Sequence, residues 1–504
     1  MLGMGGGLGF ATAAHHNGGA ALSGKRTHRQ SGKGRQMASR QGAIERAQRY
    51  FDDGGFLRDL GRRVAIASTS QEPEHAADLR AYLEQELTPR LQQLGYICEI
   101  HPNPQPQYGP FLIARRVEDP GLPTVLTYGH GDVVRGQEQS WREGLSPWSV
   151  ICEGDRIYGR GTADNKGQHT INLAAIECVL AERGSLGFNS TVLIETGEET
   201  GSPGLSDFCG AHRDLLAADA LIASDGPRLM PNLPTIFGGT RGAMNFELSL
   251  DLRDGGHHSG NWGGLLANPG IILAHAIAAI ADARGQIRVP EWRPSTLTEP
   301  VRRALANCVV DGGADGPRID LDWGEASLTP AERVFGWNSF EVLAFRTGNP
   351  DRPVNAIPPS AIAYCQLRFV VGTDPQDILP ALRRHLDREG FAQVRVAPSR
   401  SSTVMAATRL DPEDPWARWA VASLGRTAGR PPALLPNLGG SLPNEVFTDV
   451  LGMPTVWVPH SYASCSQHAP NEHLLAPVAR EGLQLMAGLF WDLGEQGAPA
   501  RRVA

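Results

Sequence analysis

The segment PTVLTYGHGD, residues 123–132, shows the pattern that decides the fold. A short run of apolar and β-branched residues, typical of a buried strand, leads directly into His130 and Asp132. The same pattern returns in STVLIETGEE (190–199), ADALIASDG (218–226) and PTVWVPH (454–460). Each of these apolar runs therefore ends at a group of polar side chains.

Helical patterns separate the apolar runs, at residues 76–94, 168–183, 414–426 and 474–493. Apolar strands that alternate with helices predict an α/β sheet whose strands are buried on both faces. Ligands bind such sheets at the carboxyl ends of the strands, where these polar groups fall. We therefore expect a functional site at that edge of the sheet.

Residues 238–400 follow a different pattern, because from Met244 to Leu252 apolar residues alternate with polar ones. This alternation predicts a half-exposed strand. A helix at 271–283, strands near 340–346 and 360–370, a helix at 375–388 and a strand at 393–397 complete the order βαββαβ of a ferredoxin-like unit. Residues 285–338 show no clear period and are predicted to be a long loop region. We therefore predict a ferredoxin-like α+β domain (238–400) inserted into an α/β domain formed by 42–237 and 401–504.

The composition excludes several classes of protein. A net charge of −7 over 504 residues argues against a nucleic-acid partner, which selects a basic face. No apolar run reaches the roughly 18–20 residues that cross a bilayer, so we expect no membrane partner. The seven cysteines form no CxxC pair, which favours a reduced, cytoplasmic protein.

Residues 1–41 differ from the rest of the chain. They are rich in Gly, Ala, Ser and His, carry several Lys and Arg residues, and include no acidic residue. The apolar stretch of a signal peptide is missing. We predict that this basic segment is disordered and lies outside the fold.

The polar groups at the strand ends supply histidines and carboxylates. They are His130 with Asp132, Asp164, Glu198 with Glu199, Asp225, and His468. Imidazole with carboxylate suits zinc, and manganese or cobalt are alternatives. A single His-x-Asp at a strand end is more often a structural pair, but five such groups together indicate a metal site. There are enough ligands for two ions with one bridging carboxylate, and one carboxylate remains as a base.

The chain resembles the M20 metallopeptidases, in particular the branch with the carnosine dipeptidases, and is also similar to the deacylases of that family. The motifs that carry the resemblance are YGHGDVV (128–134), GRGTADNKG (159–167), ETGEETGS (195–202), SDG (224–226), HSGNWGG (258–264) and SQHAPNE (466–472). The resemblance covers about residues 42–495. It implies a mixed-sheet, zinc-peptidase-like catalytic domain with an inserted dimerisation, or lid, domain that joins two subunits into a homodimer.

The resemblance also implies two divalent metal ions per subunit. Asp164 is expected to bridge them, with a cis peptide bond between Asp164 and Asn165. His130 and Asp225 are expected to complete one site, and Glu199 and His468 the other. A water held between the ions would then attack a peptide-like carbonyl.

Three further residues receive roles from the resemblance. Glu198 is expected to be the general base and acid, and Asp132 to orient His130. His258 is expected to stabilise the oxyanion in the other subunit's active site. His257 precedes it directly, so the sequence leaves open which of the two histidines faces the site.

Substrate binding is expected to use Arg368, which matches a family arginine that binds a substrate carboxylate, a geometry that suits a guanidinium. Gly440 and Ser441 resemble the family's glycine-serine loop. The predicted function is hydrolysis of an amide bond in a dipeptide or small peptide. A deacylase of N-acyl amino acids is the alternative, and an inactive metal-binding assembly protein is the alternative from another class. A two-metal phosphoesterase is disfavoured because the sequence has no basic cluster for phosphate.

Overall fold

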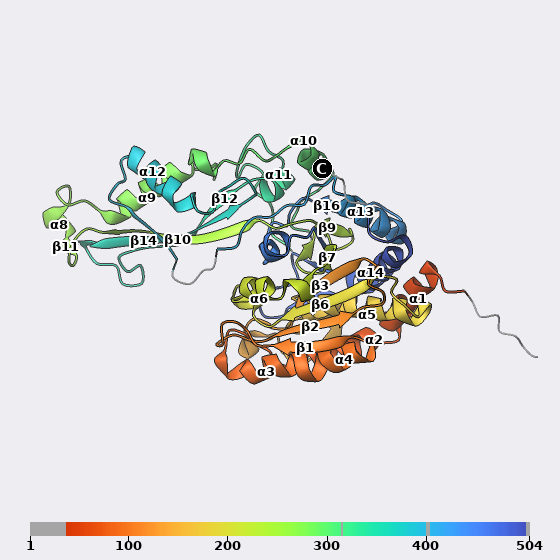
Figure 1. Cartoon of the computed structure of the whole chain (residues 1–504). Helices are drawn as coiled ribbons and strands as arrows, with labels where there is room; N and C mark the ends of the chain where they lie inside the picture. Colours follow the sequence, from red (N-terminus) through yellow and green to blue (C-terminus); the bar gives the residue numbers. More distant parts are fainter. Residues whose placement is uncertain (1–36, 314–315, 400–403, 500–504) are drawn as a thin grey trace, which may run out of the picture. The chain divides into compact units, whose positions relative to one another are not determined.

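The computed structural model describes residues 37–313, 316–399 and 404–499 (Figure 1). Most of the segment 1–41, predicted to be disordered, lies outside the described residues. Helix α1 (Arg40–Asp52) begins just before the end of that segment. Its Arg40 side chain forms an ion pair with the buried Asp492, at 2.8 Å, so the ordered fold starts slightly earlier than predicted.

The larger sheet is mixed, as predicted. In the described part of the chain its order is β1-β2-β6-β3-β7-β17-β9-β16. Neighbours are parallel from β6 through β3 and β7 to β17, and antiparallel at β1–β2, β2–β6 and β17–β9. The strands are β1 (Ile97–His101), β2 (Phe111–Arg116), β3 (Thr124–His130), β6 (Asn189–Glu195), β7 (Ala220–Ala223), β9 (Thr235–Phe237), β16 (Ala433–Leu435) and β17 (Thr455–Trp457).

Helices cover both faces of this sheet, which explains why the central strands β6 and β7 are buried along their whole length. One apolar core includes residues of α1, α2 (Gly55–Val64), α5 (Lys166–Arg183), α13 (Pro415–Ala428) and α14 (Ala476–Gln496). The core on the other face includes α6 (Leu205–Ala211). All the helices predicted for this part form. The one over 76–94 consists of α3 (Ala76–Ala81), a π-helical stretch (Tyr82–Leu87) and α4 (Thr88–Gln93), and Gly95 follows it with φ of 82°.

The smaller sheet is antiparallel and has the order β12-β14-β10-β15 among the described residues. Along the chain, its elements are β10 (Gly242–Asp251), α9 (Pro269–Ile280), β12 (Ser339–Thr347), β14 (Ser360–Phe369), α12 (Ile378–Arg388) and β15 (Arg395–Pro398). This is the predicted βαββαβ order. Burial alternates along β10 because one face packs against α9 and α12.

The prediction of a long loop at 285–338 is wrong in part. Helices α10 (Glu299–Leu305) and α11 (Pro330–Phe335) form there, and both contribute side chains to the core that α6 shares with the larger sheet. Helix α11 starts at a capping box of Thr329 and Glu332 that is visible in the sequence. Residues Ala38–Ala504 form one compact unit, so the proposed domain limits stay a prediction. None of the described helices combines the length and apolar character that crossing a membrane requires.

Candidate metal centre

The candidate site lies where strands β3, β6 and β7 of the larger sheet end. His130 is the last residue of β3, Glu198 and Glu199 form a short turn after β6, and Asp225 follows β7. Asp164 lies in the loop before α5. His468 comes from the loop that leads to β19 (His473–Leu475). Four separate segments besides β3 therefore bring their polar residues to one place.

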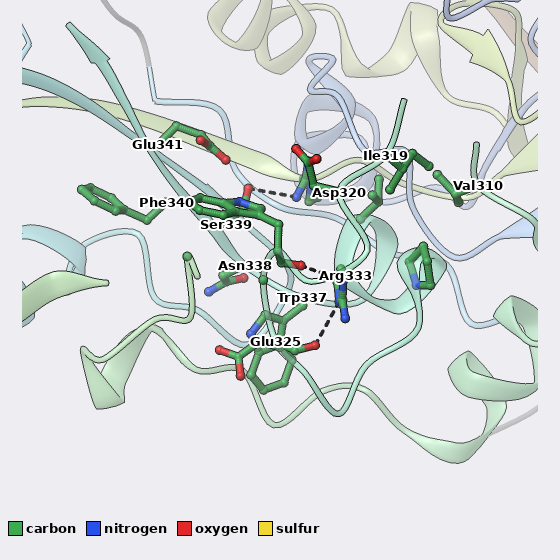
Figure 2. A pocket seen from close by; sticks show the side chains of 16 residues that line it. Val310, Ile319, Asp320, Glu325, Arg333, Trp337, Asn338, Ser339, Phe340 and Glu341 are labelled. Carbon is green, nitrogen blue, oxygen red and sulfur yellow. Dashed lines mark hydrogen bonds between the residues drawn. The ribbon is translucent and has the colours of Figure 1, made fainter. Parts of the chain in front are cut away.

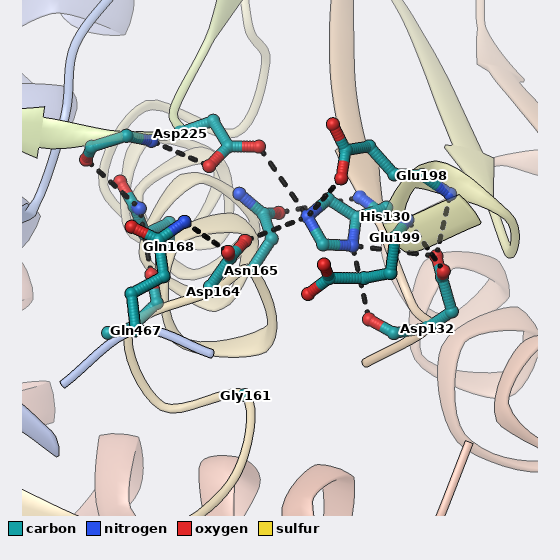
Figure 3. A network of polar contacts seen from close by, with 12 residues as sticks. His130, Asp132, Gly161, Asp164, Asn165, Gln168, Glu198, Glu199, Asp225 and Gln467 are labelled. Carbon is teal, nitrogen blue, oxygen red and sulfur yellow. Dashed lines mark hydrogen bonds and ion pairs between the residues drawn. The ribbon is translucent and has the colours of Figure 1, made fainter. Parts of the chain in front are cut away.

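Asp164 is the centre of this group (Figure 3). Its Oδ1 lies 3.0 Å from His130 Nε2, and its Oδ2 lies 3.0 Å from His468 Nε2. His130 Nε2 also lies 3.5 Å from Asp225 Oδ2, and His468 Nε2 lies 3.0 Å from Glu199 Oε2. The peptide bond between Asp164 and Asn165 is cis, as the resemblance implies.

Two groups of potential ligands share Asp164. In the group of His130, Asp164 and Asp225, and in the group of Asp164, Glu199 and His468, one ligand atom per residue lies within 4.8 Å of the others. The structure thus brings together all five residues predicted to bind metal.

Glu198 lies beside the two groups and belongs to neither. Its Oε2 is 4.0 Å from His130 Nε2, and its side chain is 11% exposed. It lines a cavity of about 590 Å³ together with Glu199 and His468. The carboxylate is therefore next to the ligand groups and accessible from the cavity.

Asp132 has two sets of contacts. His130 Nδ1 lies 3.1 Å from the backbone oxygen of Asp132 and 3.5 Å from its carboxylate Oδ1. The two carboxylate oxygens accept hydrogen bonds from the backbone N–H groups of Glu198 and Glu199, at 3.2 and 3.1 Å. Asp132 therefore faces the imidazole of His130, as expected, and also holds the 198–199 turn. The contacts with that turn were not predicted from the sequence.

Two amides at the start of α5 connect the surrounding loops. Asn165 Nδ2 donates to the Ser224 carbonyl, and Asn165 Oδ1 accepts from the backbone N–H of His130. Gln168 Nε2 donates to the Ala163 and Gly226 carbonyls. Both side chains are fully buried, and a buried polar side chain needs a specific hydrogen-bond partner. The sequence offered one signal, because Asn165 lies within the motif at 159–167 and Gln168 follows it directly.

Arg368, Gly440 and Ser441 line the same cavity as Glu198, Glu199 and His468. Arg368, on β14, donates from Nη1 to Ser441 Oγ at 3.0 Å and from Nε to Gln366 Oε1 at 3.0 Å. The Ser441 hydroxyl in turn donates to the Arg241 carbonyl at 2.7 Å. The three predicted substrate-binding residues are thus next to one another, with the arginine fixed by neighbours.

The two candidate histidines, His257 and His258, lie outside this cavity, in a separate two-stranded sheet. His257 and His258 form the short strand β11 (His257–His258), which pairs with β13 (Ala356–Ile357). His258 is exposed, and within the described chain neither histidine lines the cavity at the ligand groups. One copy of the chain therefore does not place either of them beside Glu198 in this cavity.

Figure 2 shows a second cavity, of about 390 Å³, and within the described chain no residue of the ligand groups lines it. Its lining includes Trp323, Arg333, Trp337 and Glu341, and none of the predicted site residues lines it in the described chain. Arg241 also lines it and donates from Nε to the Gly439 carbonyl at 2.8 Å, next to the Gly440–Ser441 loop.

Charge at the ligand groups is strongly unbalanced, because the carboxylates of Asp164, Glu198, Glu199 and Asp225 face only two imidazoles. Burial, together with the neighbouring carboxylates, raises the pKa of Glu198 well above its usual range and that of Glu199 to about 7. For His468, hydrogen bonds to Asp164 and Glu199 raise the pKa to about 11. Such mutual repulsion among buried carboxylates is what a bound cation relieves.

The donor set passes a direct test of fit for such ions. Asp225 Oδ2 is buried and has no hydrogen-bond partner in the described chain, although it faces His130. Buried carboxylate oxygens without a donor are rare, because desolvation of the charge is then uncompensated. The oxygen is therefore available as a ligand, and imidazole with carboxylate is the ligand set of zinc and related ions.

Comparison with known proteins places this geometry in context. The sequence model of peptidase family M20/M25/M40 matches residues 126–492. A Beta-Ala-His dipeptidase of Rattus norvegicus is 24% identical over 483 residues, which span 90% of this chain and 96% of the relative. A cysteinylglycine-S-conjugate dipeptidase of Corynebacterium striatum is 27% identical over 321 residues, which span 62% of this chain and 68% of the relative. The crystal structure of human carnosine dipeptidase 1 matches with a TM-score of 0.70 at 23% identity, covering 90% of this chain and all of that one.

Proposed function

The chain belongs to peptidase family M20/M25/M40 and is a metal-dependent peptide hydrolase, and we propose that it is a dipeptidase that uses two divalent ions. The observation that carries the proposal is the pair of ligand groups that share Asp164. His130, Asp164 and Asp225 would hold one ion, and Asp164, Glu199 and His468 the other. Zinc is the proposed metal, with manganese or cobalt as alternatives.

The proposed chemistry follows from the position of Glu198. Bound divalent ions supply Lewis acidity, which polarises the scissile carbonyl and makes a water more acidic. Glu198 faces the same cavity without belonging to a ligand group, so its carboxylate is free to accept the proton of the attacking water. The water oxygen bonds to the carbonyl carbon, the C–N bond breaks, and Glu198 delivers the proton to the leaving amine.

The substrate class follows from the other end of the cavity. Arg368 offers a fixed guanidinium beside Ser441 Oγ and Gly440, which suits a terminal carboxylate. Dipeptides and N-acyl amino acids both carry that carboxylate, so this contact alone does not separate them. The relatives named as dipeptidases favour the dipeptide, and the cavity of about 590 Å³ accommodates a small peptide.

A second copy of the chain is the proposed partner. Strand β12 is an edge strand of the smaller sheet, with an exposed apolar run in which Val342, Leu343 and Phe345 are 42%, 57% and 42% exposed. A long apolar edge is normally covered, because its unpaired backbone groups otherwise pair with other chains. We propose that a homodimer forms here and that His258, on the short strand β11, reaches the partner's cavity as the oxyanion donor. All seven cysteines are free, which supports the proposed reduced, cytoplasmic location.

Substrate choice is testable with the metal-loaded protein. We expect dipeptides to be hydrolysed with a higher kcat/KM than N-acyl amino acids, and the same dipeptides with an amidated C-terminus to react poorly, because Arg368 then has no carboxylate to bind. The measurement is amine release across a matched panel, with added zinc or manganese. Faster turnover of N-acyl amino acids would assign a deacylase instead. A protein that binds metal but hydrolyses neither class would be the inactive assembly protein.

The bridging role of Asp164 predicts an asymmetry in metal content. Asp164→Ala should lose both ions, because this carboxylate contributes to both groups. His130→Ala and His468→Ala should each weaken one site preferentially. Metal analysis of the purified variants measures this directly. Two full equivalents retained in Asp164→Ala would contradict the shared ligand.

The two adjacent glutamates should give opposite phenotypes. Glu198→Gln keeps the shape of the side chain but cannot take a proton, so kcat should fall by about 10²–10⁴-fold, the usual contribution of general base catalysis, with metal content unchanged. Glu199→Gln should instead lose metal, since Glu199 belongs to a ligand group. Each variant is the matched control of the other, and reversed phenotypes would exchange the two assignments.

Complementation tests the role of His258 across the dimer. Loss of an oxyanion donor typically costs about 10²–10³ in kcat, so His258→Ala should be nearly inactive with its metals intact. Mixing His258→Ala chains with Glu198→Gln chains should restore activity, because one site of a mixed dimer then has both wild-type residues. His257→Ala in parallel identifies which histidine acts. Subunits that exchange without recovery of activity would rule out a contribution across the interface.

A further inference from the structure

Glu472 is a buried carboxylate that the proposed reaction does not use. It is 1% exposed and lies four residues after His468. Its Oε1 accepts hydrogen bonds from the backbone N–H groups of Gly161, Ala163 and Asp164, at 3.0, 2.9 and 3.1 Å. One carboxylate oxygen therefore accepts three backbone hydrogen bonds from the loop that carries Asp164.

The other oxygen of Glu472 binds Arg160. Oε2 accepts from Arg160 Nη1 at 2.8 Å, and both side chains are 1% exposed. Arg160 Nε and Nη2 are buried and have no hydrogen-bond partner in the described chain, although the guanidinium lies over the Trp141 ring, 5.7 Å from its centroid. A buried ion pair with unmatched donors is a poor source of stability, because desolvation offsets much of the attraction. A contribution to folding stability therefore does not explain why this buried ion pair is present.

The position of the pair supplies that explanation. Glu472 and His468 belong to one loop, and Arg160 and Asp164 to another, so the ion pair and the three backbone contacts join the two loops. The Gly159 N–H also donates to the Glu472 carbonyl, at 3.1 Å. His468 itself is 54% exposed, with φ of 61°, and its ring contacts only carboxylates of the ligand groups in the hydrogen bonds described. Because the side chain is largely exposed, packing against neighbours does not by itself fix the position of the His468 ring.

We infer that Glu472, paired with Arg160, is a positioning residue of the metal centre: it sets the separation between Asp164 and His468. The inference rests on the proposed two-metal function. In the described chain Glu472 belongs to neither ligand group and does not line the cavity, so it acts by fixing the backbone from which Asp164 extends relative to the loop of His468. Hydrogen-bonded neighbours of ligands commonly have this effect, and their loss costs about 10–100-fold in metal affinity.

The test is titration of the metal-free, full-length chain with Co²⁺, followed by its visible absorption. Glu472→Gln retains the shape and an acceptor oxygen but loses the charge that binds Arg160, so Co²⁺ affinity should fall by about 10–100-fold, with a changed absorption spectrum. The thermal midpoint of each metal-free variant measures the purely structural effect separately.

Asp492→Asn is the matched control. Asp492 is also 1% exposed and binds arginine, through Arg40 and Arg426, but it joins α1, α13 and α14 rather than the metal-site loops. Its variant should lose thermal stability and bind Co²⁺ as the parent does. If Glu472→Gln does not fold, Arg160→Met/Glu472→Gln replaces it, because the double variant leaves no unpaired buried charge.

The outcomes separate the two levels of the proposal. Weaker Co²⁺ binding in the Glu472 variant, with parental binding in the control, supports positioning. Parental affinity and spectrum in the Glu472 variant, whatever its thermal midpoint, overturn it and leave the two-metal proposal intact. A parent protein that binds no Co²⁺ contradicts the metal centre itself.

Discussion

The burial of several carboxylates at one edge of a sheet is the constraint on which the rest of the structure depends. Asp164 belongs to one ligand group with Asp225 and to the other with Glu199. Buried negative charges this close repel one another, and each raises the free energy of the ionised form of its neighbours. Two imidazoles offset only part of this repulsion. The folded chain must therefore hold these carboxylates together against their mutual repulsion, which a bound cation would offset.

Both neutral amides and charged side chains support the loops that carry the potential ligands. Near the sheet, neutral side-chain amides join the loops by hydrogen bonds. Asn165 connects His130 to the Ser224 carbonyl, and Gln168 connects the loops at Ala163 and Gly226. Asn165 follows Asp164 directly and Gln168 lies in the first turn of α5, so the shared ligand and these supports come from one segment. Charged side chains also take part, as in Glu472 paired with Arg160 and in Asp132, whose carboxylate accepts from the backbone N–H groups of Glu198 and Glu199.

The sequence predicted the elements whose pattern is set by local burial. Strands buried on both faces read as continuous apolar runs, and the half-exposed β10 reads as an alternation, so both sheets were expected. The potential ligands could be predicted because several groups of His and carboxylate residues follow apolar strands, a pattern that indicates a binding site at the edge of the sheet. Helices α10 and α11 were missed because each is shorter than two turns and owes its stability to packing against the larger sheet. The contacts of Asp132 with the 198–199 turn depend on tertiary structure, and no local pattern encodes them.

The cavity itself is formed by residues from both sheets. Glu198 follows a strand of the larger sheet, whereas Arg368 lies on β14 of the smaller one, and both line the same space. The hydrogen bond from Arg368 to Ser441 joins these parts, because Ser441 belongs to the loop after β16 of the larger sheet. Any shift of one sheet against the other therefore changes the distance from the ligand groups to the guanidinium. If Arg368 binds the substrate carboxylate as proposed, a peptide would have to reach both ends, and its length would then depend on the packing of the two sheets.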